Sequence, residues 1–403
     1  AEIALVHLQH GQQRLVLEVV HVVLLPHPRQ FAEGVEIVPG EQVVLEHRFP
    51  RHAQGEQDQR RSKAGAVLAR RAVDQEALVA GLQQVAEERG VALTLRAHEL
   101  PVDVAHGFRH GLRAGEPVEA AVERADLNTE AIDEIFMGCV LPAGLKQCPA
   151  RQAARYAGIP DHVGAVTVNK ACGSGMQATI FGIDSIRAGT NSIAITGGFE
   201  SMSNAPHLML SARAGQRLGH TKIFDHMFID GLEDAYTGRA MGSFAQATAD
   251  EYGISREAMD DFSIHSLIRA KKAIEQGFLK AETVPVEVKT HRETISVVDD
   301  EQPLRGRIDK IPSLRAAFTQ DGTITAANAS SISDGASALI LASESAVEDQ
   351  GLTPMAKIVA HARSSRLPAE FTLAPVDAIS SLLDKTGWSA DDVDLWEINE
   401  AFA

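Results

Sequence analysis

The chain has 403 residues, 44% of them hydrophobic, which is enough to fill two or more cores. Its formal charge of −16 argues against a nucleic-acid-binding surface, and an anionic ligand would need a local basic patch. The longest apolar-leaning stretch, residues 15–25, is interrupted by Glu18 and His21 and is too short to cross a bilayer. With no basic leader before an apolar core, we expect a cytoplasmic protein with no membrane partner.

The first 114 residues differ in composition from the rest. They contain no Asn, Met, Tyr, Trp or Cys, yet hold nine of the sixteen histidines. This bias favours a spurious translation of a misread frame or strand over an unusual accessory domain. The pairs His7/His10 and His106/His110 have helical ligand spacing but lack an acidic partner or a second matching pair, so no metal site is predicted.

Two segments resemble each other within the remainder. Residues 128–138 and 389–399 both predict a capped helical turn, an acidic pair and then a strand, at a constant offset of 261 positions. Duplicated α/β halves would explain this echo. A capped turn before a strand is also common in α/β proteins, so the echo alone leaves both explanations open.

Cys172 lies between two predicted elements. Residues 165–168 form a β-prone run, and from Cys172 onward apolar residues recur at helical spacing. A helix N-terminus offers unpaired N–H groups and the positive end of the dipole, which favours a thiolate. Gly173 and Gly175 leave the backbone open to a ligand. The pattern predicts a nucleophile for acyl transfer through a thioester, although most free cysteines are buried and inert.

The other two cysteines serve as comparisons. Cys139 and Cys148 do not precede a glycine-spaced helix, so we expect them to be packing or loop residues. The spacing of the three cysteines matches no zinc motif and no disulfide framework, which is typical of a reducing compartment.

Further elements predict an α/β protein. A strand containing Ile193 and Ile195 follows the Cys172 helix. A helix is predicted over residues 255–277, with an apolar face that includes Met259 and Phe262, and another over residues 375–387. Residues 201–320 otherwise interrupt this rhythm with loops rich in Gly, His and Met.

Asn-Lys-Ala-Cys-Gly-Ser-Gly-Met, residues 169–176, resembles the nucleophile segment of thiolases. Within that family, residues 230–236 are most similar to bacterial acetyl-CoA acetyltransferases. The resemblance implies a thiolase-like fold of two duplicated α/β halves with a covering loop domain. It divides the chain into residues 1–114 outside the family, 115–350 as the N-terminal half with its loop domain at about 201–320, and 351–403 as an incomplete C-terminal half. Four more blocks match in order: residues 149–153, 197–206, 321–330 and 399–403.

The resemblance also implies roles for individual residues. Cys172 would accept the acyl group, and Asn399 would hold a water that helps form an oxyanion hole. Ser330 and Ala326 would lie along the pantetheine of coenzyme A. Two further substrate contacts are expected at Arg305, toward the nucleotide phosphates, and at Met241, where Ala240 replaces the family's histidine and leaves the acyl chain length open.

The family's His-Pro segment and second cysteine would follow Ala403, so the resemblance implies a fragment with impaired turnover. The first hypothesis is an acyltransferase of fatty acid metabolism that exchanges acetyl or other acyl groups between CoA thioesters, with no separate cofactor. Acyl-CoA and CoA would be its partners, and the complete protein would form a homodimer or homotetramer. The alternatives are a non-catalytic acyl-CoA or lipid binder with the same fold, and an unrelated α/β domain with coincidental motifs.

Overall fold

The computed structural model describes residues 2–7, 22–25, 115–216, 218–289 and 293–403. Two compact units are distinguished, one of Ala1–Phe31 with Val102–Ala403 and one of Ala32–Pro101. The second unit lies outside the described residues, as do His10, His106 and His110. The spurious translation predicted for residues 1–114 therefore stays a prediction.

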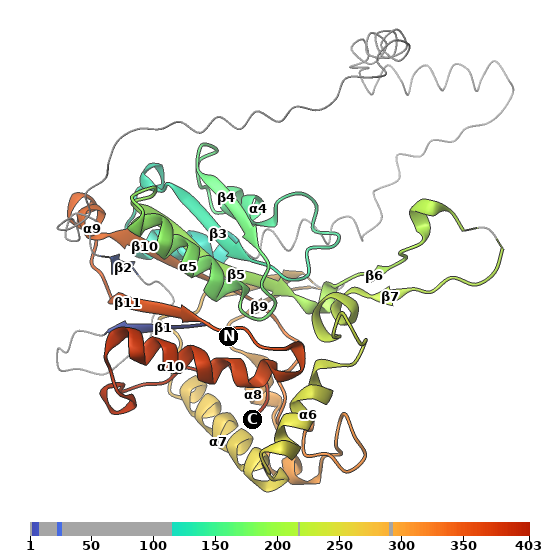
Figure 1. Ribbon diagram of the computed structural model, residues 1–403. Coiled ribbons are helices and arrows are strands. Elements are labelled where there is room, and N and C mark those ends of the chain that lie inside the picture. The colour runs from blue at the N-terminus through green and yellow to red at the C-terminus, as the bar shows by residue number, and fades with distance from the viewer. Residues whose placement is uncertain (1, 8–21, 26–114, 217, 290–292) are drawn as a thin grey trace, which may run out of the picture. The chain divides into compact units, whose positions relative to one another are not determined.

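A seven-stranded mixed sheet organises the described unit (Figure 1). Strand β3 is parallel to both of its neighbours, β4 and β5, while β10 is antiparallel to β5. The strand predicted over residues 165–168 and the strand predicted around Ile193 are thus confirmed as β4 and β5. In spatial order the strands are β1 (Glu2–His7), β11 (Ala356–Arg363), β2 (Val22–Leu25), β10 (Asp334–Ser343), β5 (Ile193–Ser201), β3 (Glu134–Gly138) and β4 (Gly164–Val168).

Helices pack on both faces of this sheet. Successive side chains of β3 point to opposite faces, so this strand contributes apolar residues to a core on each side. Ile135 and Met137 join a core with α4 (Pro149–Tyr156) and with the helical residues 115–124. Phe136 points to the other face, where α5 (Ser174–Arg187) contributes Ile183. The predicted helix after Cys172 is therefore confirmed as α5.

The chain after β10 continues the same layered packing. Helix α9 (Glu344–Gln350) leads into β11, and α10 (Ala374–Thr386) confirms the predicted helix at residues 375–387. Leu382 of α10 packs against Ala360 and Ala362 of β11. The helix ends at Gly387, whose φ of 71° is favourable for glycine.

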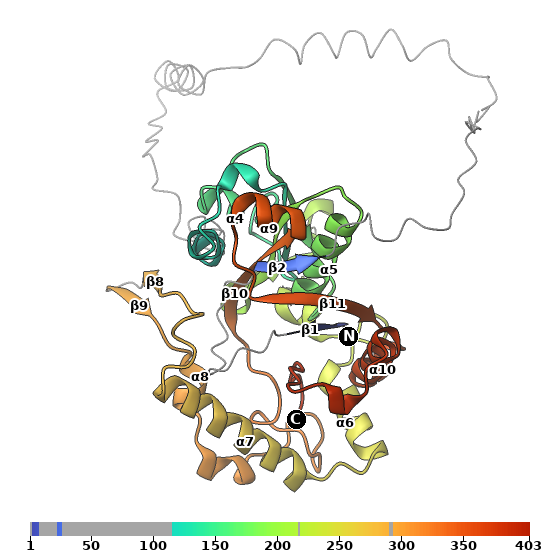
Figure 2. The ribbon, with the colours of Figure 1, turned by 90° about the vertical axis from the view of Figure 1, so that its left-hand side faces the viewer.

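The region between β5 and β10 contains more regular structure than loops alone. Helix α7 (Arg256–Glu275) is capped by Ser255, as predicted, but its expected apolar face is wrong in part, since Phe262 is 46% exposed. Helix α7, seen in Figure 2, buries Asp260 and Ser263 beside the predicted Met259, and the Asp260 carboxylate accepts from Asn328 of a neighbouring loop. The other α-helices and strands of this region are β6 (His207–Leu208), β7 (Phe224–Asp225), α6 (Met241–Glu251), β8 (Val286–Lys289), β9 (Thr294–Val297) and α8 (Glu301–Arg305). Short helical turns lie at Met202–Asn204, Ala212–Ala214, Phe228–Leu232 and Ile308–Ser313.

The two similar segments, residues 128–138 and 389–399, share a turn but not a strand. Asn128 caps the short helix Thr129–Ala131, and Ser389 caps Ala390–Asp392 through a capping box. Only the first turn is followed by a strand, β3, so the strand predicted within 389–399 is wrong for this structure. In the described part of the chain no strand lies beside residues 394–399, and a strand needs a neighbour for its backbone hydrogen bonds.

Candidate active site

The turn between β4 and α5 brings Cys172 to the N-terminal end of α5 and leaves it exposed. Ala171 has a φ of 46°, in the left-handed region that L-residues seldom occupy. Its amide donates to Asn169 Oδ1 at 3.1 Å, and its carbonyl accepts from Ser174 Oγ at 2.6 Å. Ser174 Oγ in turn accepts from the amide of Lys170 at 2.8 Å. These bonds hold the strained turn that precedes the thiol.

Glycines let α5 approach the carboxyl ends of two strands. A Cβ at Gly138, the last residue of β3, would lie 2.6 Å from the amide nitrogen of Gly175. Such a distance is not tolerated, so only glycine allows this contact. On β5, Gly198 lies beside the same pair of residues. The sequence thus packs the helix start, with Cys172, directly against the ends of β3 and β5.

A cavity of about 500 Å³ opens at this corner. It is lined by the segment that follows β3, by the C-terminal part of β5, by the Cys172 turn, by the helical turn at Phe228–Leu232 and by the start of β10. Asn399 reaches it from the far end of the sequence, and methionine and leucine side chains complete its wall. Its lining includes Cys172, Cys139, Glu200, Met227 and Asn399.

Cys139 contrasts with Cys172 although both line the cavity. Cys139 is 1% exposed, which confirms its predicted packing role, while Cys172 is exposed. Burial, reinforced by the neighbouring Glu200 carboxylate, raises the pKa of the Cys139 thiol to about 12. Cys139 is therefore a protonated thiol at neutral pH, and its environment does not favour a nucleophile.

The segment that contains Asn399 is held by a short ladder with residues 328–330. Ala329 and Phe402 form an antiparallel bridge, and the amide of Ala403 donates to the carbonyl of Asn328 at 2.9 Å. Ser330 contributes its amide and its hydroxyl to carbonyls of this segment, at 3.0 Å and 2.9 Å. The placement of Asn399 therefore depends on residues 328–330.

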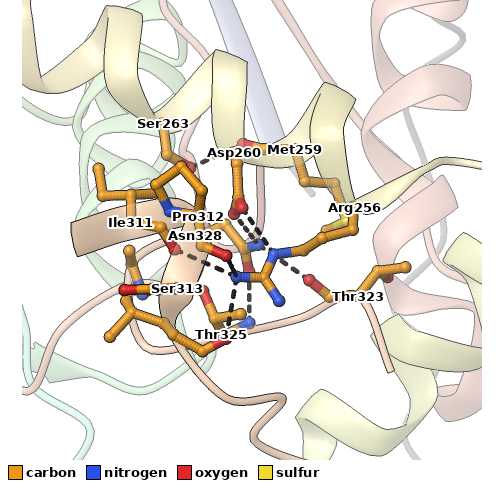
Figure 3. Close-up of polar contacts among 12 residues, drawn as sticks. Arg256, Met259, Asp260, Ser263, Ile311, Pro312, Ser313, Thr323, Thr325 and Asn328 are labelled. Carbon is orange, nitrogen blue, oxygen red and sulfur yellow. Dashed lines mark hydrogen bonds and ion pairs between the residues drawn. The ribbon is translucent and has the colours of Figure 1, made fainter. Parts of the chain in front are cut away.

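Those residues are anchored beneath α7 by a buried polar network (Figure 3). Arg256 pairs with Asp260 at 2.7 Å and donates to carbonyls of residues 311–314. The other Asp260 oxygen accepts from Asn328 Nδ2 at 3.2 Å, and Asn328 Oδ1 accepts from the amide of Thr325 at 2.6 Å. From α6, Gln246 Oε1 accepts from two backbone amides of the same loop.

The structure brings together only two of the six predicted site residues. Cys172 and Asn399 line the same cavity, whereas the other four lie outside its lining. Ala326 and Ser330 are exposed on the anchored loop, and Met241 is half-buried at the start of α6. Arg305 is exposed at the end of α8, where it pairs with Glu301. The roles of all six residues stay predictions.

No histidine among the described residues lines the cavity. His226 is buried nearby, with Nδ1 2.6 Å from Asp230 Oδ2 and Nε2 accepting from the amide of Ala143 at 3.3 Å. This arrangement assigns the proton to Nδ1 and commits both ring nitrogens to protein partners. Met227, the next residue, lies in the cavity wall.

Sequence reasoning did not identify Glu200, whose carboxylate lines the cavity and accepts from the amides of Val140 and Leu141 at 2.7 Å and 3.1 Å. The sequence did contain a signal that could have identified Glu200, namely a charged residue near the C-terminal end of an apolar strand. Within the described ranges, no helix is both long and apolar enough to span a membrane, and no group of three or more His, Cys, Asp or Glu could hold a metal ion.

The chain matches the models of two protein-family domains. The model described as "Thiolase, N-terminal domain" matches residues 113–345, and "Thiolase, C-terminal domain" matches residues 352–403. A probable acetyl-CoA acetyltransferase of Dictyostelium discoideum is 44% identical over 287 residues, covering 71% of this chain and 69% of the relative. The acetyl-CoA acetyltransferase of Escherichia coli K12 is 43% identical over 288 residues, covering 71% and 73%.

Solved structures agree in fold. The Acat5 thiolase of Ascaris suum, determined in complex with coenzyme A, superposes with a TM-score of 0.69 at 38% identity, over 73% of this chain and 75% of that chain. The acetyl-CoA acetyltransferase of Syntrophomonas wolfei gives a TM-score of 0.68 at 36% identity, over 73% and 74%. These likenesses confirm the predicted thiolase-like α/β fold.

Proposed function

Because this chain belongs to the thiolase family, we propose that it transfers acetyl or other acyl groups between CoA thioesters through Cys172. The observation that carries the proposal is the exposed Cys172 thiol at the start of α5, in a cavity that Asn399 also lines. An exposed cysteine at such a position is suited to covalent acyl transfer. The reaction class is that of an acetyl-CoA C-acyltransferase.

In the first half-reaction, Cys172 Sγ attacks the thioester carbonyl. A bond forms between Sγ and the acyl carbon, the bond from that carbon to the CoA sulfur breaks, and CoA leaves as a thiol with the proton that Cys172 gives up. Asn399 supports the developing oxyanion through a water that its side chain holds. In the second half-reaction, the sulfur of CoA or the α-carbon of another acyl-CoA attacks the acyl carbon, and the bond from that carbon to Sγ breaks. The proton that the attacking group loses returns to Sγ and regenerates the Cys172 thiol.

The non-catalytic alternative is not favoured. An acyl-CoA or lipid binder needs a cavity but has no use for an exposed thiol at a strained turn, and the relatives are named as acetyltransferases. The third hypothesis, coincidental motifs in an unrelated domain, is excluded by the family match.

Finer features of the function follow from the same proposal. Coenzyme A thioesters are substrates, no separate cofactor takes part, and Ala326, Ser330, Met241 and Arg305 are candidates for contacts along CoA. A CoA complex of a thiolase from Ascaris suum supports CoA as the ligand class. We further propose a cytoplasmic role in fatty acid metabolism, one fungal relative being named as cytosolic, and assembly as a homodimer or homotetramer.

Exchange of acetyl groups between acetyl-CoA and isotopically labelled CoA tests the proposal, because this exchange needs only the first half-reaction and its reverse. We expect the 403-residue chain to catalyse exchange and Cys172→Ser to lose it by at least about a thousandfold. Cys148→Ser, an exposed cysteine outside the cavity lining, is the matched control and should retain exchange. Equal exchange by wild type and Cys172→Ser would refute the assigned nucleophile.

A further inference from the structure

A path of hydrogen bonds runs from Glu200 to the turn that precedes Cys172. Glu200 Oε2 accepts from the amide of Val140 at 2.7 Å. The carbonyl of Val140 accepts from Asn169 Nδ2 at 3.3 Å, and Asn169 Oδ1 accepts from the amide of Ala171 at 3.1 Å. Ala171 is the residue immediately before Cys172. Three successive contacts therefore join one wall of the cavity to the turn that presents the thiol.

The path begins with a carboxylate for a geometric reason. The two oxygens of Glu200 accept from the separate backbone amides of Val140 and Leu141, at 2.7 Å and 3.1 Å. A glutamine would keep one acceptor but turn an NH₂ group toward the other amide. Since a charged acceptor strengthens hydrogen bonds, Glu200 fixes residues 140–141 more firmly than a neutral side chain would.

The path ends at a place where the backbone needs support. Ala171 has a φ of 46°, in the left-handed region, where the side chain of a non-glycine residue crowds its own backbone. Ser174 holds the turn from the helix side through the Ala171 carbonyl. Asn169 holds it from the sheet side through the Ala171 amide, and Asn169 is itself oriented by Val140.

We propose that Glu200 is a positioning residue for the nucleophile, acting through Val140 and Asn169 on the backbone of Ala171. Glu200 sets the position of the Val140 carbonyl, this carbonyl orients the Asn169 amide group, and Asn169 holds Ala171 in its left-handed conformation. The inference deepens the proposed function and rests on it for its catalytic meaning. The geometric coupling of Glu200 to Cys172 can be tested without any CoA substrate.

The test is a double-mutant cycle read by cysteine labelling. Asn169→Ala is introduced into the 403-residue chain in three backgrounds: unchanged, Glu200→Gln and Glu134→Gln. Iodoacetamide labelling is followed by peptide mass spectrometry, as the rate at Cys172 relative to the exposed Cys148 in the same sample. We expect Asn169→Ala to lower this ratio about threefold to tenfold in the unchanged chain, the worth of one hydrogen bond. In the Glu200→Gln background it should lower the ratio less than about twofold, because the path is already broken.

Glu134 is the matched control, since it lies at the opposite end of β3 and accepts from Asn191 rather than from the nucleophile turn. In Glu134→Gln, Asn169→Ala should keep its full effect. Within the Glu200→Gln background, the chains with and without Asn169→Ala both lack the Glu200 charge. The effect of losing that charge on Cys172 reactivity therefore cancels when these two chains are compared. If Asn169→Ala does not fold, Asn169→Ser takes its place in all three backgrounds, with a smaller effect expected because a hydroxyl can still accept from the Ala171 amide.

An equal effect of the Asn169 substitution in all three backgrounds would overturn the positioning role of Glu200. If Glu200 has only a structural role, Glu200→Gln will lower the unfolding temperature, but Asn169→Ala will still lower the Cys172 labelling ratio in that background. If Asn169→Ala has no effect on the labelling ratio in Glu200→Gln, the hydrogen-bond path is supported. If the wild type in addition shows no acetyl exchange, that result counts against the proposed function alone. The two failures can therefore be told apart.

Discussion

Two regions of this molecule hold the two candidate active-site residues by different means. At the Cys172 corner, α5 is pressed against strands β3 and β5, with glycine at the closest contact and apolar side chains behind it. Beneath Asn399, the buried face of α7 carries Asp260 and Ser263, and a network of side-chain and backbone hydrogen bonds holds the loop that pairs with residues 400–403.

The difference concerns what each region tolerates. Close backbone packing fails when a single methyl group is added, whereas a polar network fails when one partner is removed and another is left buried without a bond. The nucleophile corner should therefore be sensitive to added volume, and the α7 anchor to lost hydrogen-bonding groups.

The largest effect is expected at the end of the anchored segment. Asn399→Ala should lower kcat by about 10²- to 10³-fold with little change in KM, because loss of oxyanion support acts mainly in the transition state. Steady-state acetyl exchange between acetyl-CoA and labelled CoA, followed against acetyl-CoA concentration, measures both constants. Asn128→Ala removes an exposed asparagine outside the cavity lining and should leave kcat unchanged. A kcat within about twofold of wild type for Asn399→Ala would remove Asn399 from the mechanism.

The anchor itself should be costly to break. Asp260→Asn should lower the free energy of unfolding by about 2–4 kcal/mol, because Arg256 loses its buried partner. Denaturant unfolding provides the measurement. Asp261→Asn, the same change at the exposed neighbouring position, should cost less than about 0.5 kcal/mol. Similar losses in the two variants would show that the network in Figure 3 does not stabilise the fold.

Added volume tests the nucleophile corner. Gly138→Ala places a methyl group 2.6 Å from the backbone of Gly175 and should destabilise the chain by about 1–3 kcal/mol while lowering acetyl exchange. Gly335→Ala offers the contrast, because a Cβ there has no atom within 4 Å. We expect its unfolding free energy to stay near that of wild type. If both glycines accept alanine equally well, close packing does not define the corner.

The smallest effect is a pH dependence that arises from Cys139. Its folded-state pKa is raised from 9.0 to about 12 by burial and by Glu200, so above pH 9 the unfolded chain loses this proton while the folded chain keeps it. The stability contribution is fully present below pH 9 and falls as pH rises from 9 toward 12, by about 1 kcal/mol at pH 10. Urea unfolding should show that the free energy of unfolding decreases less between about pH 8 and pH 10 in Cys139→Ala than in wild type. Cys148→Ala should leave the decrease unchanged, and an identical decrease in all three chains would contradict the assignment.

The sequence predicted elements whose signals are local. Apolar spacing and cap residues identified α5, α7 and α10, and the glycine-spaced motif located Cys172 at a helix start. It did not predict the buried polar face of α7, because the partners of Asp260 lie at Arg256 and at Asn328, the latter 68 positions away. The missing strand at residues 394–399 has a similar cause: strand propensity is local, but strand formation depends on a neighbour. Glu200 went unrecognised because its contacts at residues 140 and 141 are also distant in sequence.

The central claim is that Cys172 carries the acyl group, and locating that group is its most direct test. The 403-residue chain is incubated with acetyl-CoA, quenched in acid and digested, and the three cysteine-containing peptides are compared by mass spectrometry. If Cys172 is the nucleophile, one acetyl group is expected on the peptide that contains Cys172 and none on those that contain Cys139 or Cys148. Acetylation spread equally over exposed Cys148 and Cys172, or absent from Cys172 while acetyl exchange proceeds, would contradict it.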